Sequence, residues 1–142
     1  MTINMNTVLE FYEAIREEYG NPILRTVNSQ EILNGNPVAK NIYVAVYGDG
    51  MIKSSGFDMY LYEIKYGKIT HAKIKQAFKE IGFTEGLNIL TQVKRSADLD
   101  ALDMAYYQLD EVFEACLIEY LQRSWNDPEF MLYCDSISFK QK

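Results

Sequence analysis

The chain of 142 residues carries 20 acidic and 14 basic side chains, for a net charge of −6, and 48% of its residues are hydrophobic. This length can bury a core as one domain, and the acidic balance argues against direct nucleic-acid binding and for a protein partner with a basic surface. No apolar run approaches the roughly 18 to 20 residues of a membrane span, and the first residues lack a signal-peptide pattern. We therefore expect a cytoplasmic protein without membrane association.

Residues suited to catalysis or metal binding are few. The chain has one histidine, His71, and two cysteines, Cys116 and Cys134, which form no CxxC pair. It contains no phosphate-binding glycine loop, no calcium loop and no zinc-ligand spacing. We predict no catalytic residue, no metal site and no cofactor, and we expect His71 to lie exposed in the first turn of a helix. Two enzymatic alternatives remain open, a cysteine–histidine pair and catalysis by carboxylates alone.

The first half of the chain contains two predicted helices. Apolar residues recur at three- and four-residue spacing over residues 7–19, which is typical of an amphipathic helix. Asn36 followed by Pro37 predicts the start of a second helix, because asparagine caps helices and proline suits the first helical position. The alternation in residues 42–47 is also compatible with a strand. The glycines of residues 48–50 predict an interruption of this segment.

The middle of the chain predicts two further helices. Ser54 or Ser55 can cap the first, and Gly67 closes it. Thr70 caps the next helix, which ends at Gly82. Its predicted buried stripe consists of Ile74, Ala77, Phe78 and Ile81.

An acidic block then runs from Ser96 to Gln122, with seven acids and no base. Its periodicity predicts one continuous amphipathic helix with a buried apolar stripe. On such a helix five carboxylates fall within an arc of about 100° over a rise of about 21 Å. They are Asp100, Asp103, Asp110, Glu111 and Glu114. Five carboxylates over this length compare with about six phosphates on one DNA strand.

These elements together predict an all-α fold, a single compact helical domain over residues 1–142 with about six or seven helices. The tail, residues 129–139, forms either a last helix or an extended arm over the core.

The segment Ile52–Gly67, IKSSGFDMYLYEIKYG, resembles the signature of a bacterial family of unknown function related to DNA-mimic protein. Five positions match: Gly56, Phe57, Asp58, Tyr60 and Gly67. Downstream, AFKEIGFTEGLNIL and LDMAYYQLDEVFEACLIEYL are similar to two helical segments of the family, so the resemblance spans about residues 38–121. Ser54 and Ser55 depart from the signature.

The resemblance implies an all-α fold in which Gly56 is a tight backbone position and Phe57 and Tyr60 are core residues. The best-understood relatives are acidic proteins that occupy the DNA-binding face of a transcription factor. A role of this kind depends on the surface more than on the fold.

We therefore predict partner binding through two acidic rows. The first is the set of five carboxylates between Asp100 and Glu114, and the second, on the first helix, is Glu10, Glu13 and Glu17. Two other interpretations remain open: an immunity or antitoxin protein that blocks a toxin's active site, and solvated helix faces with no binding role. A homodimer is also compatible with the high aromatic content.

Overall fold

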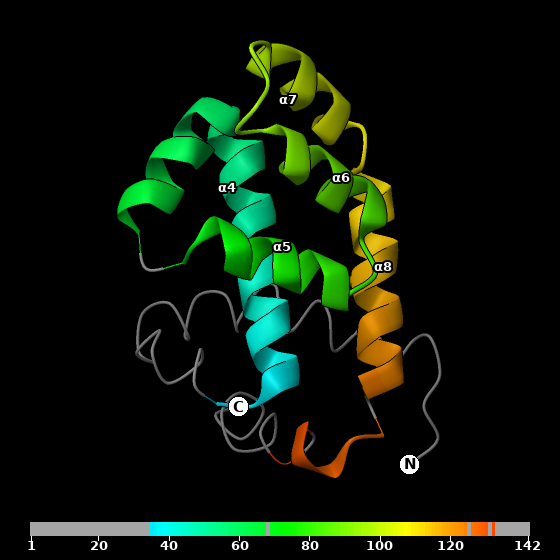
Figure 1. The fold of residues 1–142 in the computed structure, drawn as a ribbon. Helices are drawn as coiled ribbons and strands as arrows, with labels where there is room; N and C mark the ends of the chain where they lie inside the picture. Colours follow the sequence, from blue (N-terminus) through cyan, green and yellow to red (C-terminus); the bar gives the residue numbers. More distant parts are fainter. Residues whose placement is uncertain (1–34, 68, 125, 131, 133–142) are drawn as a thin grey trace. The chain divides into compact units, whose positions relative to one another are not determined.

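The computed structural model describes residues 35–67, 69–124, 126–130 and 132 (Figure 1). The helix expected over residues 7–19, including Glu10, Glu13 and Glu17, and most of the tail lie outside these described residues. The secondary structure within them is helical throughout, which confirms the all-α prediction. That residues 1–142 form one domain stays a prediction.

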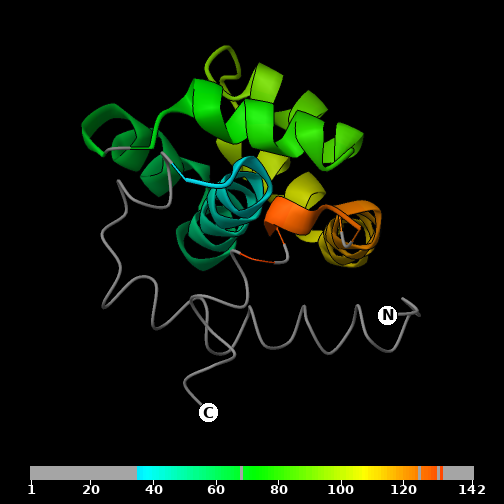
Figure 2. The same cartoon turned by 90° about the horizontal axis from the view of Figure 1, so that it is seen from below.

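The described residues form five longer helices, which are labelled in Figure 1 and seen from below in Figure 2. They are α4 (Pro37–Tyr66), α5 (His71–Glu80), α6 (Thr84–Gln92), α7 (Leu99–Tyr107) and α8 (Asp110–Ser124). Residues 128–130 and 132 are also helical. The chain groups into two compact units, and one of them, Val44–Cys116, contains all of α5, α6 and α7. The described residues of the other unit come from the start of α4 and the segment from Leu117 onward.

Helix α4 begins where the sequence predicts. The side-chain oxygen of Asn36 accepts hydrogen bonds from the backbone N–H groups of Val38 and Ala39, at 2.9 and 3.2 Å. This satisfies two of the backbone donors that a helix start leaves without partners. Residues 42–47 are helical, so the strand alternative is wrong.

The predicted interruption at residues 48–50 is also wrong, because α4 continues through them. A Cβ atom at Gly48 would lie 2.7 Å from a methyl group of Ile74, so this glycine lets α5 approach α4 closely. Asp49 is buried, and the phenol of Tyr106 donates a hydrogen bond to it. Helix-helix packing and this hydrogen bond therefore outweigh a glycine's intrinsic cost of about 1 kcal/mol.

The break falls instead at Gly56, with φ 76° and ψ 178°. Helix α4 changes direction there (Figure 1). Neither predicted serine caps the second half. The hydroxyl of Ser54 lies 3.3 Å from the carbonyl oxygen of Met51, and the backbone N–H of Phe57 donates to Asp103 on α7, at 2.8 Å. A residue 46 positions away thus caps the second half of α4.

The predictions for α5 are confirmed. The Thr70 hydroxyl accepts from the backbone N–H of Lys73, at 3.2 Å, and Gly82 has φ 79° after the last turn. All four residues of the predicted stripe, Ile74, Ala77, Phe78 and Ile81, are buried.

Aromatic rings fill much of the core of the 44–116 unit. The ring centroids lie 5.0–6.4 Å apart, and most of the pairs meet edge to face, the geometry that aromatic quadrupoles prefer. The rings belong to Phe57, Tyr60, Phe78, Phe83, Tyr106 and Phe113. The family positions Phe57 and Tyr60 are therefore core residues, as expected.

The acidic block forms two helices, and the single continuous helix predicted for it is wrong. Helix α7 ends at Tyr107 and α8 begins at Asp110. Between them the backbone N–H of Leu109 bonds to the carbonyl of Tyr106 in a tight turn, and the helix axes differ in direction (Figure 1). Tyr106 before the turn bonds to Asp49, and Asp110 after it pairs with Lys53, so α4 anchors both sides.

Candidate functional site

The break between α7 and α8 divides the five predicted carboxylates into two groups. Asp100 and Asp103 belong to α7, whereas Asp110, Glu111 and Glu114 belong to the first turns of α8. The single row of about 21 Å that one ideal helix would produce is therefore absent. The second row, Glu10, Glu13 and Glu17, lies outside the described residues.

Asp103 has a role in the fold. Besides accepting from Phe57, its carboxylate occupies the space next to Gly56, where a Cβ atom would lie 2.9 Å from Oδ2. Gly56 is thus required for two reasons, its positive φ and the close approach of Asp103. A carboxylate at the start of a helix is also favoured by the helix dipole. Sequence reasoning missed this role because the two residues are far apart in the chain.

Asp110 belongs to a polar network that links α4, α7 and α8. The ammonium group of Lys53 pairs with Asp110 and lies 2.9 Å from Oδ2 of Asp49. It also lies 5.4 Å from the ring centroid of Phe113, and the Tyr106 hydroxyl donates to Oδ1 of Asp49 at 2.7 Å. The charge of Asp110 is therefore partly neutralised within the chain.

Burial and hydrogen bonding within this network shift the pKa values of Asp49, Tyr106 and Lys53. Burial raises the pKa of Asp49, although its hydrogen bonds from Tyr106 and Lys53 oppose the shift. Burial also raises the pKa of Tyr106, and the neighbouring Asp49 carboxylate adds to the rise. For Lys53, burial lowers the pKa, but the bonds to Asp110 and Asp49 outweigh it and the net shift is upward.

The other three predicted carboxylates form no ion pair within the described part of the chain. Asp100 and Glu111 are exposed and Glu114 is half-buried, and no ion pair with a described residue involves them. A fourth acid, Asp98, accepts from the backbone N–H of Ala101 and caps α7.

Two exposed apolar side chains lie beside these acids. On α7, Met104 is 64% exposed and Tyr107 is 44% exposed. With Asp100 they occupy positions i, i+4 and i+7, which share one side of a helix. Exposed aromatic and methionine side chains are enriched at protein interfaces. The i, i+4, i+7 spacing is visible in the sequence, whereas the exposure of Met104 and Tyr107 and the burial of their neighbour Tyr106 are seen only in the structure.

His71 is half-buried, so the expectation of an exposed residue is wrong. Its Nδ1 lies 2.7 Å from the hydroxyl of Tyr60, and it has a backbone hydrogen bond with Leu90. Burial, with smaller effects from Lys94 and Lys75, lowers the pKa of His71 to about 4. The imidazole is therefore neutral at pH 7 and is a weak base.

The described residues offer no obvious metal centre. They contain no group of three or more histidine, cysteine or acidic side chains placed to hold a metal ion. The thiol of Cys116 is half-buried, 3.6 Å from the carbonyl oxygen of Gly82. Within the same part of the chain, no helix is long and apolar enough to cross a membrane.

Comparison with known proteins supports the resemblance to DNA-mimic proteins. The family described as DMP19-like protein matches residues 34–124, more than half of the chain. The match covers the signature segment with its break at Gly56, as well as α7 and α8. No curated protein and no solved structure matches the chain. The chain therefore belongs to the DMP19-like family, a family of DNA-mimic type.

Proposed function

We propose that this chain is a non-enzymatic protein-binding protein of the DNA-mimic type, and that α7 and the first turns of α8 cover the basic surface of a DNA-binding regulator. The observation that carries the proposal is the base-free acidic block, which retains three available carboxylates in a chain of this family. The only histidine is a weak base, and its ring is hydrogen-bonded to Tyr60 and to the backbone of Leu90. Both properties support a non-enzymatic role.

The division of the acidic block limits what can be mimicked. Helix α7 has nine residues and is about 14 Å long, which equals the rise of about four base pairs. A duplex carries one charge per about 1.7 Å, more than this surface supplies. We therefore expect the protein to cover a short part of its partner's DNA-binding surface, and not a surface that binds a long DNA segment.

The apolar stripe of α7 should supply much of the affinity. Exposed charge pairs contribute little each and are screened by salt, whereas buried aromatic anchors dominate many interfaces. Met104 and Tyr107 are the candidates for such anchors because they lie exposed beside Asp100. The carboxylates should then set partner choice and association rate.

The test is affinity capture with the whole chain, at about 50 and 200 mM salt, followed by measurement of affinity for the captured DNA-binding protein. A variant with Asp100→Asn, Glu111→Gln and Glu114→Gln should bind at least about tenfold more weakly. Asp103 and Asp110 are left unchanged because both hold the fold. The matched control removes three other exposed acids through Glu80→Gln, Glu85→Gln and Glu129→Gln, and it should bind normally.

Three results would overturn the proposal: binding that ignores ionic strength, equal losses in both triple variants, or a partner with no DNA-binding activity. Capture of a toxin whose activity the chain blocks would favour the immunity alternative. DNA competition decides between these outcomes, because a mimic and the regulator's DNA exclude each other.

A further inference from the structure

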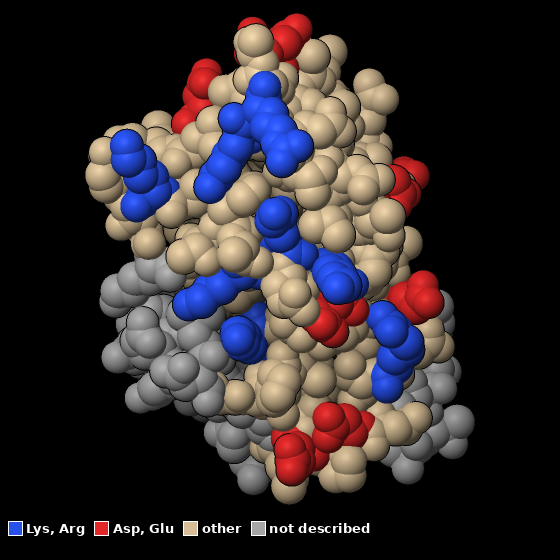
Figure 3. All heavy atoms as spheres, in the orientation of Figure 1, with Lys and Arg blue, Asp and Glu red and all other residues tan. Residues whose placement is uncertain are grey.

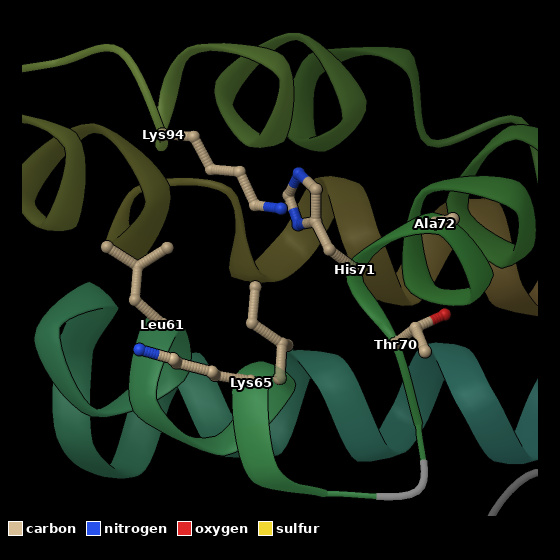
Figure 4. A pocket seen from close by; sticks show the side chains of 7 residues that line it. Leu61, Lys65, Thr70, His71, Ala72 and Lys94 are labelled. Atoms are coloured by element: carbon tan, nitrogen blue, oxygen red, sulfur yellow. The ribbon is translucent and has the colours of Figure 1, made fainter.

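A pocket opens within the 44–116 unit, and none of its lining residues belongs to the acidic block. It lies between the second half of α4, the start of α5 and the residue Lys94 after α6 (Figure 4). Its volume is about 500 Å³, within the range of about 300 to 1,000 Å³ that small-molecule sites occupy. The lining consists of Leu61, Ile64, Lys65, Thr70, His71, Ala72 and Lys94.

The charge of this lining is entirely positive. Lys94 reaches across the pocket so that its ammonium group ends beside the His71 ring (Figure 4). Lys65 extends along the opposite wall and points away from that ring, with its ammonium group 5.5 Å from the ring centroid of Tyr66. None of the seven lining residues is acidic, and neither lysine forms an ion pair with a described residue.

The surroundings extend this positive field. Lysines and arginines gather over the face that α5 and α6 present in Figure 3, with the acids mainly toward its margins. Among the described residues of this part of the chain, the exposed or half-buried bases are Lys65, Lys73, Lys75, Lys79, Lys94 and Arg95. The effect of Lys94 and Lys75 on the pKa of His71, second to burial, is a consequence of the same field.

The floor of the pocket is apolar. Leu61, Ile64 and Ala72 contribute hydrocarbon. The hydrogen bonds of His71 to Tyr60 and Leu90 hold its imidazole, which is neutral at pH 7, in place as part of the lining. An inorganic anion would leave this hydrocarbon surface uncovered. A ligand with an apolar body and one anionic group fits both parts of the lining.

We propose that this pocket binds a small organic anion, whose carboxylate lies beside the ammonium group of Lys94 and whose apolar body lies on Leu61 and Ile64. This site is separate from the acidic surface, and it would make a protein that binds a macromolecule also responsive to a metabolite. The inference does not depend on the identity of the protein partner.

The single histidine of the chain lines the pocket and can report on binding, because the Cε1–H proton of its imidazole gives one NMR signal. The probe is benzoate, titrated at pH 7 into the whole protein. We expect a saturable shift of the His71 signal with a dissociation constant on the order of 1 mM or tighter. Benzamide has the same shape without the charge and should bind at least about tenfold more weakly.

The variant Lys94→Gln should weaken benzoate binding about fivefold or more, because it removes the ammonium group beside His71. The matched control Lys79→Gln removes an exposed lysine of α5 that does not line the pocket, and its affinity should stay within about twofold of wild type. Equal binding of benzoate and benzamide, equal losses in both variants, no shift at all, or a saturable shift with inorganic phosphate but not benzoate would each overturn the proposal.

Discussion

The acidic region of α7 and α8 and the basic region around α5 differ in how far their charges are used by the fold. In the acidic region, Asp103 caps the second half of α4, Asp98 caps α7 and Asp110 pairs with Lys53. In the basic region, Lys65 and Lys94 line a pocket without a described acidic partner. A count of charges therefore overestimates the acidic surface that a partner can reach. The basic region contains a pocket whose lining holds no acidic residue.

The largest expected effect comes from the glycine that Asp103 requires. Gly56→Ala places a side chain at φ 76°, ψ 178°, a region that only glycine adopts readily, and forces a contact with Asp103. We expect a loss of about 3 kcal/mol or more in the free energy of unfolding, measured by urea denaturation. Gly50→Ala is the control. Its Cβ would meet open space within a helix, so it should stabilise the protein by about 0.5 to 1 kcal/mol.

The next prediction compares the two carboxylates that pair with Lys53, the buried one of Asp49 and the exposed one of Asp110. Lys53→Met leaves the buried Asp49 carboxylate without its cation, and we expect a loss of about 2 to 3 kcal/mol at pH 7. Burial raises the pKa of Asp49 and Lys53 opposes this rise, so the pKa of Asp49 should be higher still in the variant. As the pH rises and the Asp49 carboxylate ionises, the variant should therefore lose more stability than the wild type. Asp110→Asn removes the exposed partner and should cost about 1 kcal/mol or less. Equal losses from both variants would contradict the assigned roles.

A smaller effect distinguishes the two acids of α7. Asp103→Ala removes the cap at Phe57 and should cost about 1 to 2 kcal/mol in thermal or urea unfolding. Asp100→Ala should change stability by less than about 0.5 kcal/mol, because no described residue depends on its carboxylate. The prediction fails if Asp100 proves the more costly of the two to replace.

The smallest effect is the pH dependence from His71 in the basic region. The pKa of His71 is lowered from 6.5 to about 4, so the unfolded chain binds its proton at a higher pH than the folded chain does. Stability should therefore fall as pH drops from about 6.5 toward 4, by about 1 kcal/mol once solvent screening of this half-buried group is included. His71→Gln should remove this component, which the difference between the two denaturation curves measures. An unchanged pH dependence would contradict the assignment.

Local signals explain which parts of the fold could be predicted. The caps Asn36 and Thr70, the stop at Gly82 and the buried stripe of α5 depend on residues within one turn of each other. The break in α4 could not be located in this way. Turn and capping rules do not separate Gly48, Gly50 and Gly56. The family signature alone marked Gly56 as a tight backbone position, and the positions of Ile74 and Asp103 explain why Gly48 and Gly56 differ.

The candidate sites were predictable to different degrees. The acidic block and the i, i+4, i+7 spacing of Asp100, Met104 and Tyr107 are visible in the sequence, but the exposure of Met104 and Tyr107 is seen only in the structure. The pocket was not predictable, because Lys65 and Lys94 are separated by 29 positions and no periodicity connects them.

The amino-acid sequence by itself determined the helical class, both ends of α4 and of α5, and the family, because these depend on short-range backbone chemistry and a local signature. Only the tertiary structure decided which charges are available for binding. Capping and ion pairing act here between residues that are 46 or 57 positions apart, and chain folding alone brings such groups within hydrogen-bonding distance.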